Sequence, residues 1–455
     1  MQDRKDLTDA KINRDLLDFV LVTPFWFWVT LLFLIMVLTV AAYAFSMIVN
    51  YGLGLTGLNR PVQWGFLITN FVFWVGISHA GVMISAILRL TQAEWRRPVT
   101  RAAEVLTVFA LATAAMHPVL HAGRPWRVYF EFPYDFMRGV WPQVKSALVW
   151  DPSAIFTYLS SSAMFVYIAL LPDLAVARDR TTGWKHTLYS MLSLGFRGTS
   201  RQWRLQLIAG ILLSALILPV FVSVHSIVSF DFSMALVPVW HSTVFPPYFV
   251  IGAVHSGVSA VATLMAILRW VFKLEDYITP DHFDALGRLL IVVSTAWFYF
   301  FILEFVYGIY MREDVELAVN DLRVFVWPFN LMSVVFLLTG YFIPVSLWLF
   351  KRVRRNIVWM FWSSLLVNVG MWLERFLIII PGLALKQPLT YSWGEYFPQP
   401  VEFAIVVGSF ALVIAGVFLF SKFFPIIPAF DIKEGQILKA RIKIGRRDVP
   451  ALIHE

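Results

Sequence analysis

Two histidines and an aspartate stand where the chain passes out of one apolar run and into the next. His117 and His121 lie four residues apart in MHPVLHAGRPW, and Asp151 begins the following run in VWDPSAIFTYL. Residues four apart share one face of a helix. An imidazole accepts and releases a proton near neutral pH, and a carboxylate can accept another. His121 and Asp151 therefore predict a proton-accepting site, provided that the two helix ends lie side by side.

The composition places this site in a membrane protein. The chain has 455 residues, of which 59% are hydrophobic and 15% are charged, with a mean hydropathy of +0.71. The first 19 residues carry charges of both signs and lack the apolar core and cleavage site of a signal peptide. We therefore expect the first apolar run to be retained as a membrane span.

Ten apolar runs are long enough to cross a bilayer, which takes about 20 helical residues. The long, continuous runs favour helices over strands. The expected spans are Phe25–Val49, Trp64–Leu88, Ala103–His121, Ser153–Leu171, Leu205–Val228, Phe245–Trp270, Leu286–Tyr310, Trp327–Leu349, Ile357–Ile380 and Val401–Phe424.

The basic residues predict the orientation. The two termini and the loops on their side hold 28 Lys and Arg residues, whereas the opposite loops hold eight. The positive-inside rule then predicts a multi-pass protein of the bacterial inner membrane with both termini cytoplasmic, and His121 and Asp151 near the outer face. Most of the excess behind the net charge of +8 lies in loops on one membrane face. The charge therefore gives no reason to expect nucleic-acid binding.

A short repeat indicates the helix organisation. HAGV begins at His79 in the second span, and HSGV begins at His255 in the sixth, 176 residues later. The copies lie four spans apart, so both point the same way and predict two four-helix bundles, spans two to five and six to nine. The expected division is 1–24 cytoplasmic segment, 25–49 peripheral helix, 63–228 first bundle with the site, 244–380 second bundle, 401–424 peripheral helix and 425–455 cytoplasmic tail.

A charge within the hydrocarbon is costly, so ionisable residues at membrane depth are functional candidates. His117, Arg124 and His79 are expected to support the site. Further candidates form a possible proton path: Glu104, Asp173, His255, Glu304, Glu374 and Arg375.

Each candidate also has a structural interpretation. His79 and His255 precede small residues and can hydrogen-bond across a close helix crossing. Glu104 and Asp173 either begin a proton path or, as the safer expectation, face interfacial water. Asp151 lies before Pro152 and can cap the fourth span.

Arg375 is expected to pair with a neighbouring span, through Glu304 or Glu402. The adjacent Glu374 is not expected to be its partner, because consecutive residues do not face each other on a helix.

The chain offers few ligands for a redox cofactor. It has no cysteine, which excludes a cysteine-ligated iron–sulfur cluster, a covalently attached c-type haem and a disulfide. His79 and His117 are the pair that could meet as haem ligands, but no His pair is duplicated on helical spacing. We expect neither haem nor a metal site in this chain.

Three blocks together resemble a known family. GLNRPVQWGFLITNFVFWVGISHAGVMISAILRL, MHPVLHAGRPW and VWDPSAIFTYL are similar to the NrfD/polysulfide reductase membrane subunits, and most similar to ActC of alternative complex III. The resemblance implies two haem-free four-helix bundles and a quinol site near the outer face at His121 and Asp151. Ten spans favour ActC over the eight-span members, and the intact His121 and Asp151 argue against the paralogous ActF.

The resemblance also implies partners. Quinol, with menaquinol favoured, would be oxidised here, and its electrons would pass to an iron–sulfur subunit docked on the outer face and then to multihaem c-type cytochromes, beside an ActF-like membrane subunit. Residues 122–150 are the expected docking loop. Two alternatives remain: the anchor of another NrfD-type reductase, and a proton-translocating or transporter protein without a redox role.

The orientation can be tested directly. A reporter that is active only outside the cytoplasm, fused after Glu455, should remain inactive because the tail is expected to stay on the basic, cytoplasmic side. The same reporter inserted after Arg312, in a loop on the opposite side, should be active. Activity at Glu455 would reverse the assignment of the two faces.

Overall fold

The computed structural model describes residues 8–131, 145–384, 394–437, 441–444 and 447–450. Within these residues ten helices are long and apolar enough to cross a membrane, which confirms the predicted number and helical class. They are α2 (Phe25–Tyr51), α3 (Phe66–Leu90), α4 (Thr100–His121), α5 (Ala147–Asp179), α7 (Ser200–Ser233), α8 (Phe245–Val271), α9 (Pro280–Met311), α11 with η4 and α12 (Phe329–Leu337, Leu338–Phe342, Ile343–Trp348), α14 (Ile357–Ala384) and α15 (Pro400–Phe423).

Shorter elements lie between and beyond the spans. The centre of the expected docking loop, 132–144, falls outside the described residues. The shorter elements are α1 (Asp9–Leu21), η1 (Leu53–Leu55), η2 (Glu94–Arg96), η3 (Pro125–Glu131), α6 (Trp184–Leu192), α10 (Asp314–Phe325), α13 (Lys351–Arg354), α16 (Ala429–Ile437) and a two-stranded antiparallel hairpin, β1 (Arg441–Ile444) with β2 (Arg447–Pro450).

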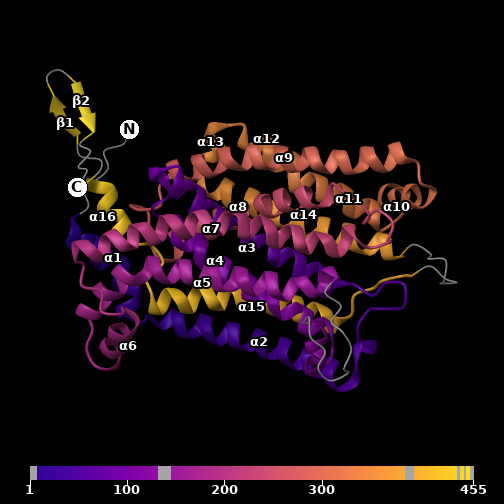
Figure 1. The fold of residues 1–455 in the computed structure, drawn as a ribbon, viewed down its shortest axis with the longest axis horizontal. Coiled ribbons are helices and arrows are strands. Elements are labelled where there is room, and N and C mark those ends of the chain that lie inside the picture. Colours follow the sequence, from indigo (N-terminus) through magenta and orange to yellow (C-terminus); the bar gives the residue numbers. More distant parts are fainter. Residues whose placement is uncertain (1–7, 132–144, 385–393, 438–440, 445–446, 451–455) are drawn as a thin grey trace.

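The spans run side by side along the long axis of the molecule, and α1 and α16 lie together at one end (Figure 1). We call this the tail end, and the opposite end, where α4 finishes and α5 begins, the His121 end. Helices α3, α4, α5 and α7 pack together, as do α8, α9, α11–α12 and α14. Helices α2 and α15 pair with each other beside α4.

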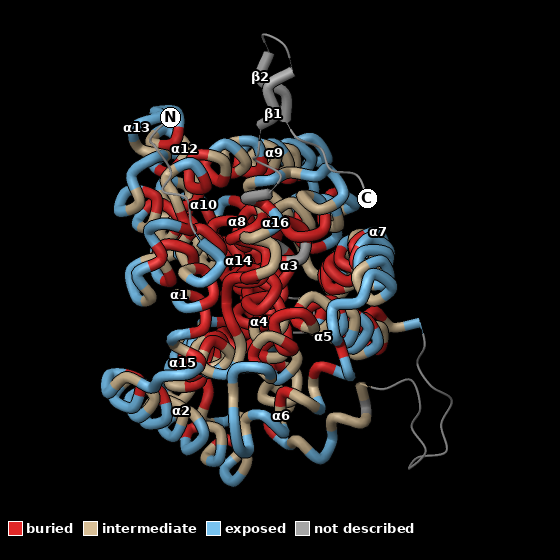
Figure 2. The backbone as a smooth tube through the Cα atoms, turned by 90° about the vertical axis from the view of Figure 1, so that its left-hand side faces the viewer, coloured by how far each residue is buried: buried red, intermediate tan, exposed pale blue. Residues whose placement is uncertain are grey.

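Burial is concentrated where the two groups of helices meet. The spans differ in burial over their most apolar stretches of 18 residues. In α3, 81% of that stretch is buried and in α8 72%, whereas in α2 only 17% is buried. Buried positions accordingly gather around α3, α4 and α14, while α2 and α7 present exposed faces (Figure 2). The helices that carry the repeated His-small-Gly motifs, α3 and α8, pack against each other at this centre. Small residues permit such a close approach between helices.

Several spans are longer than the sequence suggested, and the extensions of α5 and α7 bear on the site. Helix α5 begins at Ala147, with Ser146 as its N-cap, so Asp151 lies inside the helix and the structural alternative, that it caps the span, is wrong. Pro152 misled the boundary because proline favours the first turn of a helix. Helix α7 continues five residues beyond the expected Val228, to Ser233.

Helices α14 and α11–α12 meet at two glycines. An added Cβ at Gly370 would lie 2.5 Å from the backbone nitrogen of Gly340, within the π-helical segment η4. Gly370→Val should therefore lower the thermal midpoint of the detergent-solubilised protein, by an overpacking cost of about 1–3 kcal/mol or more.

Gly54→Val is the matched control, since a Cβ at Gly54 meets no atom within 4 Å. Equal midpoints for the two variants would contradict the close packing of α14 on η4.

Candidate quinol site

A cavity of about 420 Å³ lies at the His121 end of the first group of helices. Its size falls within the usual range for a small-molecule site. Helices α3, α4 and α5 form its walls, with η3 and the end of α7 closing it. Its lining residues are Trp64, Ile68, Phe71, Ala115, Pro118, Val119, His121, Ala122, Val128, Glu131, Leu148, Asp151, Pro152, Ile155, Phe156, Leu159, Asp231 and Phe232.

Four ionisable side chains line this otherwise apolar cavity: His121, Glu131, Asp151 and Asp231. Three of their buried polar atoms, Nδ1 of His121 and Oδ1 of Asp151 and of Asp231, have no hydrogen-bond partner in the part of the chain that the structure describes. A buried polar atom without a partner costs about 1–3 kcal/mol. The cavity thus presents polar atoms that a bound molecule can satisfy.

Two of the carboxyl groups interact directly. The Asp151 and Asp231 side chains lie within hydrogen-bonding reach of each other. A hydrogen bond between two carboxyl groups requires a proton between them, so the pair can take up or release a proton as a unit. Burial raises the pKa of the Glu131 carboxyl in η3, and the Asp151 charge raises it further.

Local sequence explains how His121 reaches the cavity. Helix α4 runs through Pro118 and ends at His121, and Gly123 follows with a φ of +65°, a conformation that favours glycine at a helix end. Pro118 and Pro152 both line the cavity. Neither has an N–H to donate to the carbonyl four residues earlier.

His117 occupies a different environment from His121. The Asn70 amide donates to its Nε2 over 2.8 Å, and its Nδ1 donates to the Thr113 carbonyl over 2.8 Å. Asn70 also donates to Ser409 of α15, over 2.7 Å. His117 is therefore held in a network joining α3, α4 and α15, and it is not among the residues that line the cavity.

The other two supporting candidates also lie outside the cavity lining. Arg124 is exposed just beyond α4. His79 is fully buried, with Nε2 3.1 Å from the Phe221 carbonyl of α7 and its ring 4.6 Å from that of His225. Its contacts match the structural alternative, a hydrogen bond across a helix crossing.

Comparison with known proteins identifies the family. Residues 54–386, which contain the eight spans from α3 to α14, match the family described as polysulphide reductase, NrfD. This chain belongs to the NrfD family.

Two curated relatives match most of this chain. One, from Halobacterium salinarum, is described as a membrane subunit of dimethyl sulfoxide reductase and is 23% identical over 419 residues, 84% of this chain and 87% of that protein. The other, from Archaeoglobus fulgidus, is named an Hdr-like menaquinol oxidoreductase integral membrane subunit and is 21% identical over 407 residues, 86% of this chain and 91% of that protein.

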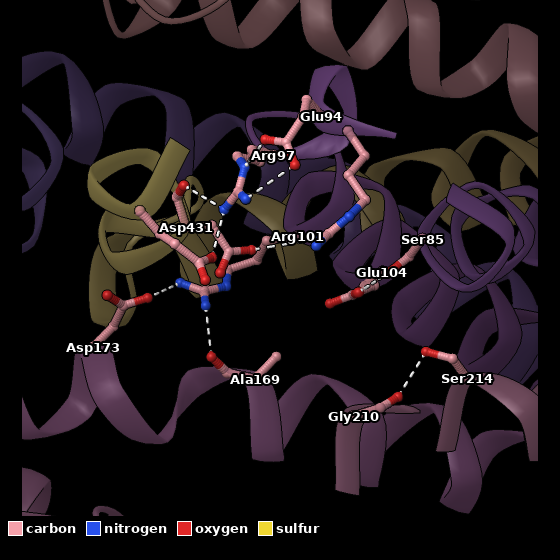
Figure 3. Close-up of polar contacts among 12 residues, drawn as sticks. Ser85, Glu94, Arg97, Arg101, Glu104, Ala169, Asp173, Gly210, Ser214 and Asp431 are labelled. Carbon is pink, nitrogen blue, oxygen red and sulfur yellow. Dashed lines mark hydrogen bonds and ion pairs between the residues drawn. The ribbon is translucent and has the colours of Figure 1, made fainter. Parts of the chain in front are cut away.

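At the tail end of the molecule, where α1 and α16 lie, Glu104 and Asp173 are buried, and their side chains have partners inside the protein (Figure 3). Ser85 donates to Glu104, and Arg101 forms an ion pair with Asp173. The expectation that these carboxylates face interfacial water is therefore wrong. Segment 425–435 covers this region, because Arg97 donates to the Asp431 carbonyl over 2.9 Å.

In the second group of helices, Glu374 and Arg375 pair with each other. Nη1 of Arg375 lies 3.0 Å from Oε2 of Glu374, so the expectation that adjacent residues cannot meet is wrong. Their side chains are long enough to curl toward each other across one helix face. Tyr248 and Trp297 also donate to Glu374.

The expected partners of Arg375 are engaged elsewhere. Glu304 pairs with Arg323, 3.1 Å away. Glu402 accepts from the Tyr396 hydroxyl over 2.6 Å and from the Gly57 N–H over 2.8 Å. The prediction that Arg375 pairs with Glu304 or Glu402 is wrong.

His255 is buried in α8, away from the cavity at the His121 end. Its Nε2 shares a hydrogen bond of 2.8 Å with Ser294, and its ring lies 5.3 Å from that of Trp297. The proton-path candidates thus fall into two separate regions, Glu104 and Asp173 at the tail end of the first group and the remaining four in the second group.

Sequence reasoning missed two polar residues of the site region. Asp231 escaped notice because the fifth span was ended at Val228, although the alternating Ser-Phe-Asp-Phe that follows continues the helix. Asn70 was passed over because a neutral amide carries no charge to attract attention. Nevertheless Asn70 is fully buried and contacts residues of three other helices, and Trp372 donates to it over 3.3 Å.

The Arg101–Asp173 pair provides a stability test. Asp173→Asn should leave the buried Arg101 charge without its counter-ion and lower stability by about 3–5 kcal/mol, the usual cost of breaking a buried pair. Thermal midpoints in detergent would measure the change.

Glu104→Gln is the matched control, because the Ser85 hydroxyl can still donate to the amide oxygen. An equal or larger loss for Glu104→Gln would contradict the assignment of Asp173 as the structural partner of a buried cation.

Proposed function

We propose that this chain is the quinol-binding membrane subunit of a respiratory or photosynthetic quinol oxidoreductase, and that it oxidises quinol in the cavity at His121 and Asp151. The observation that carries the proposal is the set of unpartnered buried polar atoms, on His121, Asp151 and Asp231, that face one apolar cavity. The flat aromatic head of a quinol suits the apolar walls, and its two hydroxyl groups suit the polar end. The relative named as a menaquinol oxidoreductase subunit favours menaquinol as the substrate.

The polar groups then act as proton acceptors. Oxidation of one quinol releases two electrons and two protons. Nδ1 of a neutral His121 ring accepts one hydroxyl proton, and the Asp151–Asp231 pair accepts the other through its free Oδ1 atoms. Each acceptor needs to lie about 2.6–3.2 Å from the hydroxyl oxygen. The apolar walls and His117, fixed by Asn70, hold α4 in position for this contact.

The electrons must leave this chain. Because it has no cysteine to ligate an iron–sulfur cluster, the acceptor is a partner subunit that carries one, docked at the His121 end over the loop 122–150. The two spans outside the family match, α2 and α15, support a role closest to ActC of alternative complex III, with multihaem cytochromes as later acceptors and an ActF-like subunit alongside.

Variants of the cavity should separate substrate chemistry from structure. His121→Ala or Asp151→Asn should reduce quinol oxidation by roughly 100-fold or more, since positioned proton acceptors contribute about 10²–10⁴-fold. Asp231→Asn should reduce it less if the remaining carboxylate retains one acceptor oxygen. Turnover of menaquinol with an artificial electron acceptor, in the intact purified complex, measures all three.

His117→Gln is the control for altering an α4 histidine outside the cavity, because an amide can accept from Asn70. It should retain most of the activity. Near-normal turnover by an assembled His121→Ala, Asp151→Asn double variant would remove this cavity from consideration.

A further inference from the structure

The cavity has one wall that is exposed at membrane depth. Among its lining residues, Leu148 is 50% exposed and Phe156 is 72% exposed, whereas Phe71 and Phe232 on the far walls are buried. Phe156 lies nine residues into α5, about 14 Å along the helix at 1.5 Å per residue. Phe156 thus lies within a membrane-spanning helix, and the wall that it forms is apolar and exposed.

On its exposed side, the cavity is lined by residues of α4 and α5. Helix α5 packs chiefly against α7 and less against α4, its neighbour in sequence. On α4, Ala115 and Val119 line the cavity and remain partly exposed. This exposed side is thus edged by apolar side chains, while His121 and Asp151 lie farther along the same cavity.

We infer that a quinol with an isoprenoid tail enters sideways from the lipid between α4 and α5, and that Phe156 determines how its tail is accommodated. This inference rests on the proposed function. The occupant follows from the continuity of the cavity: a polar head must reach His121 and Asp151, and an apolar chain attached to it must leave past Phe156. The tail passes from lipid to protein, so its contacts with Phe156 and Val119 contribute through packing and not through water-driven burial.

A second groove on the opposite face of α5 provides a comparison. It has a volume of about 560 Å³ and lies between α5 and α7, with Ser153, Thr157 and Pro219 in its lining. The described residues that line it include no ionisable side chain. Phe156 and Thr157 are both exposed neighbours on α5 but face different grooves, so a change at Thr157 tests the specificity of a change at Phe156.

The experiment compares a tailed and a tailless substrate in the intact complex. Phe156→Trp should raise KM for long-chain menaquinol about fivefold, equivalent to about 1 kcal/mol at 1.4 kcal/mol per tenfold, and leave KM for menadiol unchanged. Thr157→Trp should change neither KM. An unchanged KM for menaquinol in Phe156→Trp, or an equal change for both quinols, would overturn the inference.

A crosslink identifies the occupant independently of turnover. Benzoylphenylalanine at position 156 should capture long-chain menaquinone in native membranes, whereas the same residue at position 157 should not. Capture of a protein subunit at 156 would overturn the lipid-side entrance. If Phe156→Trp leaves KM unchanged and position 156 captures no menaquinone, while His121→Ala still reduces turnover, only this inference is refuted. Normal turnover in the His121→Ala, Asp151→Asn variant would refute the proposed function itself.

Discussion

The structure depends on one constraint: inside hydrocarbon, a polar side chain finds its hydrogen-bond partners only within the protein. Asn70 illustrates the result, since its amide connects His117 of α4, Ser409 of α15 and Trp372 of α14. Such contacts hold helices together where water-driven burial offers no preference between lipid and protein. They also position α4, and with it His121, because two hydrogen bonds through Asn70 link the peripheral helix α15 to His117 of α4.

The two groups of helices use the same constraint differently. In the second group the ionisable residues pair among themselves, as Glu374 does with Arg375 and Glu304 with Arg323. In the first group, at the His121 end, buried polar atoms of His121, Asp151 and Asp231 face an open space without partners among the described residues. A buried ion pair contributes little net stability but is costly to break once it is formed. Buried atoms of Glu374 and Arg375 also lack hydrogen bonds, but those of His121, Asp151 and Asp231 line a cavity, which makes the first group the place to seek a substrate.

The lengths of α5 and α7 decide where the carboxyl groups of the cavity meet. Helix α5 begins six residues before its expected start, which places Asp151 inside the helix beside the end of α7 instead of at a solvent-facing cap. Helix α7 extends to Ser233 and brings Asp231 to Asp151. Two carboxyl groups in contact form a single proton-exchanging unit. This unit, opposite an imidazole in an apolar cavity, is the arrangement that the proposed chemistry needs.

The sequence by itself determined the membrane class, the ten helical spans and the candidates His121 and Asp151, because hydrophobic length and residue type are local properties. The end of α4 is local in origin as well, because Gly123 takes a positive φ that favours glycine. Only the tertiary structure decided partners. Asp231 joins Asp151 from 80 residues away, His117 turns to Asn70, and Arg375 pairs with its own neighbour Glu374. Pairing depends on helix rotation and depth, which follow from packing between distant segments and leave no periodic signal in the chain.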